Sequence, residues 1–461
     1  MFKAAFYEAE VTPPLGTAMP GCSNPRGAED VEDKVYAKAV VISNGKETVA
    51  TVVLDSVALP EDSFDVISKR VGEYTGIRPE CITICANHTH EGAPLTSNYY
   101  GDNQEKGYID VVIRRMADCI TLAHKRMQPV KIKYACGEVY GASFNRNFVM
   151  RDGSLLTNVG RDEATNIMEL TIEPDFKYVK FSDAQNDPDA EIYNKNCLGN
   201  LAGIDPSLPI LAFEGEDGKL IGVMINFACH QTCLSGTSIS GDYSSILSKE
   251  LKKTYGDDFV SLFIIGTAGD INHVDYSKPK ATDLKGTWKK HGKMLADEAR
   301  RVLANAEEIK GDTLGSKRAI VKVGIRQVTE EDVRREAELS VNNVKKGFHN
   351  VMRAYSYMQG NKRTSEDLPV QCVRIGDVYY YSLPGEVYVN YGLEIKKHSP
   401  SDKNLITELA HGHAGYIPTK EAFHPKSCIY ETSPGFVSPY EVNTGSMLVE
   451  KVLELANELK D

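Results

Sequence analysis

Two histidines separated by one residue are the first side chains in this sequence that could bind a metal ion or move a proton. His88 and His90 lie in the polar segment 87–92, directly after a short apolar run. In extended backbone, residues i and i+2 point to the same side, so both imidazoles face one space with their Cα atoms about 7 Å apart. One ring could then bind a metal while the other reaches a water or the substrate. The same pattern also fits a polar loop at the end of a strand that has no metal-binding or catalytic role.

A third histidine, His230, follows the apolar run 220–228, which has the character of a buried strand. A buried imidazole without a partner is costly, so His230 is either a hydrogen-bonded core residue or a ligand. Cys229 and Cys233 flank it and offer a zinc thiolate site. No second Cys-x-x-Cys arm accompanies them, and Cys229 should point away from His230 on a strand. The sequence therefore disfavours a thiolate site.

Two Gly-Asp pairs and one arginine are further candidates. Asp242 follows Gly241 and Asp270 follows Gly269, each beside one of the apolar runs. An aspartate at such a place either caps a turn or holds the imidazole of a metal ligand from behind. Arg146 lies in a loop-like stretch, where a lone arginine is usually solvated and becomes a substrate clamp only in the right context.

Two strand–helix–strand units are predicted to position these residues. The first has strands at 50–54 and 81–86 around a helix at 60–74, and its second strand leads into His88. The second unit has strands at 220–228 and 259–265 around a helix at 242–255. Such units favour an α/β fold with a mixed or parallel sheet, in which ligands gather at the carboxyl ends of strands.

The remaining pattern fits one large α/β domain across residues 1–461, with mixed β-sheets flanked by helices. A mostly polar stretch, 173–200, reads as a surface excursion inside that domain. Periodicity and turn signals predict the other elements. These are helices at 285–306, 329–352 and 447–459, a strand at 316–328, and a hairpin of strands 370–375 and 378–383.

Composition excludes several classes of protein. The chain has 461 residues, of which 41% are hydrophobic and 25% charged, so it can build a sizeable core and is neither disordered nor a rod. Its 53 basic and 64 acidic residues give a net charge of −11, which disfavours nucleic acid as a partner. No stretch is long and apolar enough for a transmembrane segment. The ten scattered cysteines and an N-terminus without a leader pattern predict a cytoplasmic protein with free thiols.

Read together, the motifs resemble those of the neutral/alkaline ceramidase family. The segment 87–94, Asn-His-Thr-His-Glu-Gly-Ala-Pro, is similar to the family's His-Thr-His-Ser-Gly-Pro segment. The ordered set covers nearly the whole chain, which makes it far more specific than any one piece. The other matching segments, in order, are 10–14, 144–147, 205–206, 226–232, 240–243, 383–386 and 415–421.

The resemblance implies a zinc amidase. It places the metal ligands at His88, His230, Glu386 and Tyr416. It also implies that His90 and Arg146 contact the substrate carbonyl or the attacked centre. Two imidazoles, a carboxylate and a phenolic oxygen suit Zn²⁺. The phenol, with an ordinary pKa of about 10, would need the metal to lower that pKa. Without the resemblance, Tyr416 would be read as a core aromatic.

Two departures from the family pattern change the expected substrate. The family has a serine, proposed to take part in amide cleavage, where this chain has Asn272. A carboxamide cannot act as a nucleophile, although it can donate a hydrogen bond to an oxyanion. Family ceramidases are also usually exported and carry a C-terminal β-sandwich region, and the sequence predicts neither for this chain. We therefore expect a small-molecule substrate other than ceramide.

The sequence predicts a zinc-dependent hydrolase that cleaves an amide with metal-activated water. His90 relays the proton, and Arg146 with Asn272 binds the developing oxyanion. An ester or lactone substrate at the same site is an alternative. A zinc-holding pseudoenzyme or binding protein is another, favoured by Asn272. The last is a cysteine hydrolase using Cys85 or Cys233 near a histidine.

Overall fold

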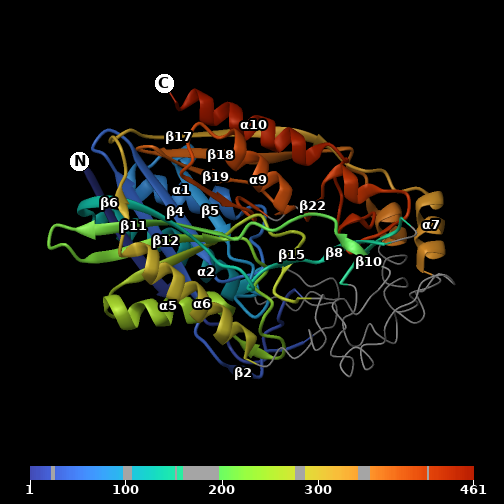
Figure 1. Cartoon of the computed structure of the whole chain (residues 1–461), viewed down its shortest axis with the longest axis horizontal. Coiled ribbons are helices and arrows are strands. Elements are labelled where there is room, and N and C mark those ends of the chain that lie inside the picture. Colours follow the sequence, from blue (N-terminus) through green and yellow to red (C-terminus); the bar gives the residue numbers. More distant parts are fainter. Residues whose placement is uncertain are drawn as a thin grey trace.

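A nine-stranded mixed sheet forms the centre of the computed structural model (Figure 1). Its strand order is β14-β12-β11-β6-β1-β3-β4-β5, with β16 paired to β6. The pairs β4–β5 and β12–β14 are parallel and the other pairs are antiparallel. The strands are β1 (Phe2–Glu10), β3 (Tyr36–Ser43), β4 (Thr48–Leu54), β5 (Ile82–Ala86), β6 (Gln128–Glu138), β11 (Ser207–Gly215), β12 (Leu220–Phe227), β14 (Val260–Ile265) and β16 (Glu307–Glu308). The structure describes residues 1–21, 26–96, 106–150, 153–158, 197–275, 286–340, 354–412 and 415–460.

A second sheet packs against the first, and helices cover the outside of both. Its order is β17 (Leu314–Gly324), β18 (Ser365–Ile375), β19 (Val378–Ser382), β21 (Asn404–Thr407), and it touches β4, β11, β12 and β14. Helix α10 (Thr444–Glu458) packs on β17 and β18 beside α9 (Val389–His398). On the opposite side of the molecule, α5 (Asp242–Tyr255) and α6 (Thr287–Leu303) cover the central sheet (Figure 1). Helix α2 (Lys106–Lys125) packs on β1, β3 and β4, and α1 (Ser63–Thr75) packs on α2.

Short elements surround the ends of these strands. They pair as β2 (Asp30–Val31) with β13 (Ser238–Ile239), β7 (Phe144–Asn145) with β15 (Ile271–Asn272), and β20 (Glu386–Val387) with β22 (Tyr416–Ile417). A further small sheet contains β8 (Asn147–Met150), β9 (Leu155–Thr157), β10 (Cys197–Asn200) and β23 (Ser427–Cys428). The remaining helical elements are η1 (Pro79–Cys81), α7 (Glu330–Ser340), 354–360, η2 (Lys420–Phe423) and η3 (Tyr430–Thr432).

The predicted α/β fold and both strand–helix–strand units are confirmed. Strands β5 and β14 are buried along their whole length, which explains why they read as continuous apolar runs. The predicted hairpin is β18–β19, and the last helix begins at Thr444, three residues before its predicted start. The predicted helix from 329 begins at Glu330, but its continuation over 341–352 lies outside the described residues. The same holds for most of the excursion at 173–200.

The central sheet curls until its two edges meet. Edge strand β14 contacts β5, the strand at the opposite end of the order. Such curling follows from the right-handed twist that accumulates across a large sheet. It brings the loop after β5 close to the loop after β12, although the two strands are far apart in the sheet order. No helix of the described residues is both long enough and apolar enough to cross a membrane.

We expect the tight contact between α5 and α6 to be sensitive to one added methyl group. A Cβ at Gly292 of α6 would lie 2.5 Å from the Tyr243 carbonyl oxygen of α5. Gly292→Ala should therefore lower the free energy of unfolding in urea by about 1–3 kcal/mol through overpacking. Gly107→Ala is the matched control, because Gly107 is also helical and has open space around its Cα. Equal stability of the two variants would contradict this packing.

Candidate metal centre

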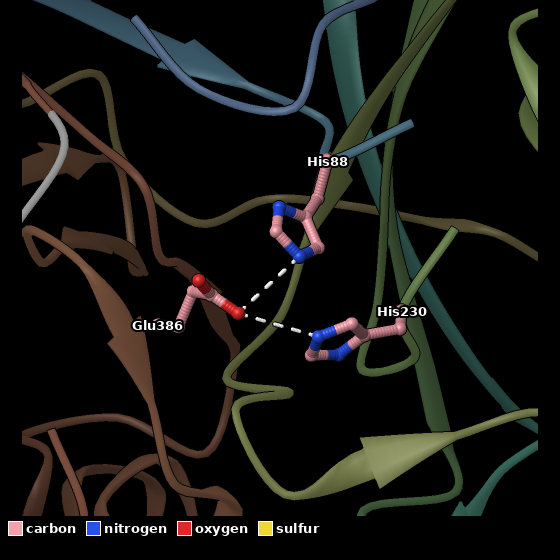
Figure 2. A group of neighbouring side chains, drawn as sticks. All are labelled: His88, His230 and Glu386. Atoms are coloured by element: carbon pink, nitrogen blue, oxygen red, sulfur yellow. Dashed lines mark ion pairs between the residues drawn. The ribbon is translucent and has the colours of Figure 1, made fainter. Parts of the chain in front are cut away.

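His88, His230 and Glu386 converge in the protein interior (Figure 2). His88 lies after β5, His230 lies after β12, and Glu386 begins β20. Their potential ligand atoms all lie within 4.8 Å of one another, and all three residues are buried. The Glu386 Oε2 atom lies 3.3 Å from the Nε2 atom of each histidine. The structure thus brings together three of the four predicted ligands, which come from distant parts of the chain.

The hydrogen bonds of the two imidazoles leave their lone pairs facing the carboxylate. His88 Nδ1 lies 2.8 Å from the Val57 carbonyl oxygen, and His230 Nδ1 lies 2.8 Å from that of Ala268. A carbonyl only accepts, so each Nδ1 carries the proton and each Nε2 presents a lone pair. Glu386 Oε2 is itself buried and receives no hydrogen bond.

A divalent cation fits this arrangement. Three buried acceptor atoms that face one another are unfavourable unless a positive charge lies between them. In a tetrahedral zinc site with bonds of about 2.0–2.1 Å, neighbouring ligand atoms lie about 3.3–3.4 Å apart. The separations between Glu386 Oε2 and the two Nε2 atoms, 3.3 Å each, match that spacing. The group can therefore hold a metal ion, and the backbone carbonyls behind the imidazoles orient them for it.

The loops that carry the two histidines are bound directly to each other. The Gln231 side chain donates to the Asn87 carbonyl at 2.6 Å, and the His90 N–H donates to the Gln231 carbonyl at 3.2 Å. His88 adopts a left-handed conformation with φ 70°, which is uncommon outside glycine, and its N–H donates to the Ser56 carbonyl. The surrounding contacts therefore hold His88 in a backbone conformation that a free loop would avoid.

Tyr416 lies beside Glu386. The two residues are direct partners in the parallel pair β20–β22, so their side chains leave the same face of that pair. The Tyr416 hydroxyl accepts a hydrogen bond of 3.2 Å from Arg146. Burial and the negative charge of Glu386 raise the pKa of Tyr416 above its ordinary value. Its phenolic oxygen becomes a good ligand only when a bound metal ion lowers this pKa. The assignment of Tyr416 as the fourth ligand therefore stays a prediction.

Arg146 places a fixed positive charge next to this group. Its Nε donates to Glu431 at 2.6 Å and its Nη2 donates to the Gly269 carbonyl at 2.7 Å. Its Nη1 lies 3.5 Å from His230 Nε2. Burial alone lowers the pKa of Arg146, but Glu431 and Tyr416 more than reverse this and raise it. The guanidinium is thus held charged and in place, as a clamp on a carbonyl or carboxylate oxygen requires.

The His90 ring lies beside those of His88 and His230, with centroid separations of 4.9 and 6.3 Å. Its Nε2 is 3.4 Å from His88 Nε2, and it is not one of the three residues of the metal-holding group. Burial and the neighbouring imidazoles lower the pKa of His90 well below its ordinary value. Arg26 donates to the His90 carbonyl at 2.7 Å, and the backbone of Gly21 packs against the ring. The residue is therefore placed to exchange a proton next to the metal group.

Asp242 and Asp270 do not hold the imidazoles, contrary to one of the two roles predicted for them. Asp242 accepts hydrogen bonds from the backbone N–H groups of Leu234 and Tyr243, which is the turn-capping role. Asp270 accepts from the Asn145 side chain and from the Val389 N–H. The backbone carbonyl groups of Val57 and Ala268 orient the imidazoles instead. Burial raises the pKa of each of these aspartates to about 6.

Asn272 lies in β15, whose partner strand β7 leads directly into Arg146. Its side chain donates to Asn158 Oδ1 at 3.3 Å and accepts from the Val274 N–H at 3.0 Å. The neighbouring Ile271 carbonyl accepts the His230 N–H. Asn272 is therefore part of the walls that support the site, and its contact with an oxyanion stays a prediction.

Glu431, Glu408 and Arg26 belong to none of the sequence motifs. Glu431 binds Arg146, and Glu408 accepts hydrogen bonds from two backbone N–H groups beside the metal group. Each is a single charged residue in a stretch with no distinctive spacing. The only sign of their importance is that they are charged residues in the protein interior. Burial is set by the tertiary fold, so the local sequence does not show it.

The cysteines that the structure describes are not part of this centre. Burial raises the pKa of the Cys85 thiol to about 12, and it also raises that of Cys229 and Cys233. Such thiols stay protonated at neutral pH, whereas a cysteine nucleophile must be a thiolate. Within the described residues, no cysteine joins the metal-holding group. The structure thus disfavours both the cysteine hydrolase and the zinc thiolate alternative.

Comparison with known proteins links this fold to ceramidases. The neutral ceramidase of Pseudomonas aeruginosa is 24% identical over 218 residues, which covers 45% of this chain and 26% of that protein. Its crystal structure superposes with a TM-score of 0.71 at 19% identity, over the whole of this chain and 74% of the other. A ceramidase complexed with C2 gives a TM-score of 0.68 over 75% of its chain, also at 19% identity. No family model matches the sequence.

The fold and the buried metal-holding group define a protein with the ceramidase-like hydrolase architecture. The matched sequence segment spans about a quarter of the curated relative. The sequence similarity and the shared fold agree with the resemblance of its motifs to those of neutral ceramidases.

Removing any one ligand should abolish tight metal binding. His88→Ala, His230→Ala and Glu386→Ala each leave two of three donor atoms, so we expect purified variants to lose stoichiometric metal in elemental analysis. His291→Ala is the control, since His291 is buried in α6 and its Nδ1 is bound to the Thr287 carbonyl. A wild-type protein without bound metal after zinc addition would contradict the site.

Proposed function

We propose that this protein is a zinc-dependent hydrolase that cleaves an amide bond in a small-molecule substrate. The observation that carries the proposal is one carboxylate oxygen that lies 3.3 Å from each of two Nε2 atoms, in a buried site flanked by Arg146 and His90. The family supports the same class of reaction, since the relatives are ceramidases.

The side chains around the metal position have distinct tasks. His88, His230, Glu386 and Tyr416 would hold zinc, which supplies Lewis-acid polarisation of a carbonyl and lowers the pKa of water. His90 accepts a proton at Nε2 and returns it to the leaving amine, a contribution of about 10²–10⁴-fold. Arg146 binds the oxygen on which negative charge develops. Burial of the site excludes bulk water and strengthens these electrostatic interactions.

The substrate differs from ceramide in this proposal. Asn272 occupies the position of the family serine, so the chain depends on water as its nucleophile. The same arrangement can cleave an ester or lactone, because both present the same carbonyl. Cytoplasmic location stays a prediction.

A second candidate, a zinc-holding binding protein, is favoured by Asn272 alone. It keeps the metal group and Arg146 as a binding site for a carbonyl or carboxylate, and it lacks turnover. The two candidates differ in only one observable property, which is metal-dependent catalysis.

A substrate panel with metal control decides between them. We expect zinc-loaded protein to hydrolyse at least one short N-acyl amide, ester or lactone, to lose activity in a chelator, and to regain it with zinc. His230→Ala should be inactive in the same panel, because it lacks a metal ligand. Retention of zinc without any metal-dependent turnover would support the binding protein. Turnover that persists in the chelator and in His230→Ala would contradict both.

The contact between Gly21 and His90 gives a more specific prediction. A Cβ at Gly21 would overlap the His90 ring, so Gly21→Ala should displace the ring and lower kcat by about 10²-fold or more, with zinc content unchanged. Gly16→Ala is the matched control. Gly16 has nearly the same backbone conformation, φ 85° against 89°, but open space around it. Equal losses in both variants would mean that backbone strain, and not the His90 contact, controls the rate.

A further inference from the structure

One segment, residues 408–411, joins the two edges of the curled central sheet. The Glu408 N–H donates to the Ile265 carbonyl at the end of β14. On the other edge, Ala410 forms a bridge with Cys85 of β5, and the His411 N–H donates to the Ile84 carbonyl at 2.9 Å. The segment thus closes the sheet at the end where His88 and His230 lie.

The same segment also reaches the strand of the third ligand. The Leu409 N–H donates at 3.0 Å to the carbonyl of Gly385, the residue before Glu386. Leu409 and His411 have φ of 53° and 60°, the left-handed region that residues other than glycine rarely adopt. Such conformations persist where the surrounding structure fixes the backbone, and they cluster at functional sites.

The carboxyl group of Glu408 lies behind the metal group. Glu408 is fully buried, and its Oε2 accepts hydrogen bonds from the Ala268 N–H at 3.1 Å and the Val387 N–H at 2.6 Å. Ala268 is the residue whose carbonyl orients His230, and Val387 follows Glu386 directly. One oxygen atom therefore links the backbone that aims His230 to the backbone that carries Glu386.

Stability alone does not account for a carboxyl group at this position. The second oxygen, Oε1, is buried and has no hydrogen-bond partner. Burying a carboxyl group with incomplete hydrogen bonding is costly, and an apolar side chain of similar size is often neutral or more stable at such a place. What an apolar side chain cannot supply is an acceptor for both backbone N–H groups at once.

We propose that Glu408 is a positioning residue that sets the separation of Glu386 and His230 and thereby tunes the affinity of the metal centre. The proposal rests on the proposed zinc site. Glu408 does not bind the metal itself. It acts through the Ala268 carbonyl and the Val387 backbone, in the way that outer hydrogen bonds orient metal ligands in proteins.

Zinc affinity of four variants, measured by competition with a chromophoric chelator, tests this role. Glu408→Leu, which offers no acceptor, should weaken zinc binding by about 10–100-fold, the range for loss of a ligand-orienting hydrogen bond. Glu408→Gln keeps an acceptor oxygen at the same reach and should stay within a few-fold of wild type. In Glu408→Asp the side chain is shorter by one methylene and cannot reach both N–H groups, so zinc binding should weaken about 10-fold. This variant replaces Glu408→Leu in the test if Glu408→Leu does not fold.

Gln371→Leu is the control for a merely structural effect. Gln371 is also fully buried, and its side chain accepts from Thr83 and donates to the Glu80 carbonyl and Ser316, away from the metal group. Urea unfolding of the metal-free proteins should show lost stability for Gln371→Leu without any change in its zinc affinity.

Unchanged zinc affinity in Glu408→Leu or Glu408→Asp, or an equal loss in Gln371→Leu, would overturn the role of Glu408 and leave the zinc site intact. A loss in Glu408→Gln as large as in Glu408→Leu would do the same, because the acceptor would then not matter. Failure of the unaltered protein to bind zinc would instead overturn the proposed function, and this role with it.

Discussion

The structure depends on the meeting of three electron-pair donors at one buried point. His88, His230 and Glu386 face one another, and a backbone carbonyl fixes each imidazole from behind. Glu386 Oε2 lies 3.3 Å from each Nε2 atom in the buried interior, so three lone pairs that repel one another are held close together by the fold. Three features keep these groups in place. They are the curled sheet, the hydrogen-bonded loops that carry the two histidines, and the buried Arg146–Glu431 ion pair.

Sequence patterns predicted the parts of the fold that local physics determines. Apolar runs and amphipathic periodicity located both strand–helix–strand units, because burial of a strand or helix face is written in consecutive residues. The strand ends gave His88 and His230. Glu386 and Tyr416 came from family resemblance alone, since β20 and β22 are two-residue strands that exist through their pairing with each other.

The sequence could not predict the features that depend on contacts between distant parts of the chain. The Gly-Asp pairs allowed two readings, and turn capping was the correct one for Asp242, because its loop folds back on its own backbone N–H groups. Glu408 and Glu431 carry no motif, and their importance appears only once the chain surrounds them. Their signal is the free-energy cost of burying a carboxyl group, which depends on the three-dimensional surroundings.

The meeting of the sheet edges has a consequence for how the chain folds. Segments around residues 88, 230 and 386 are distant in sequence, so an ion bound among them acts as a reversible cross-link between long loops of the unfolded chain. The three donors meet only where both edges and the second sheet come together, so the complete donor set exists only in the folded chain. A bound ion would therefore add its binding free energy to the native state of the whole chain.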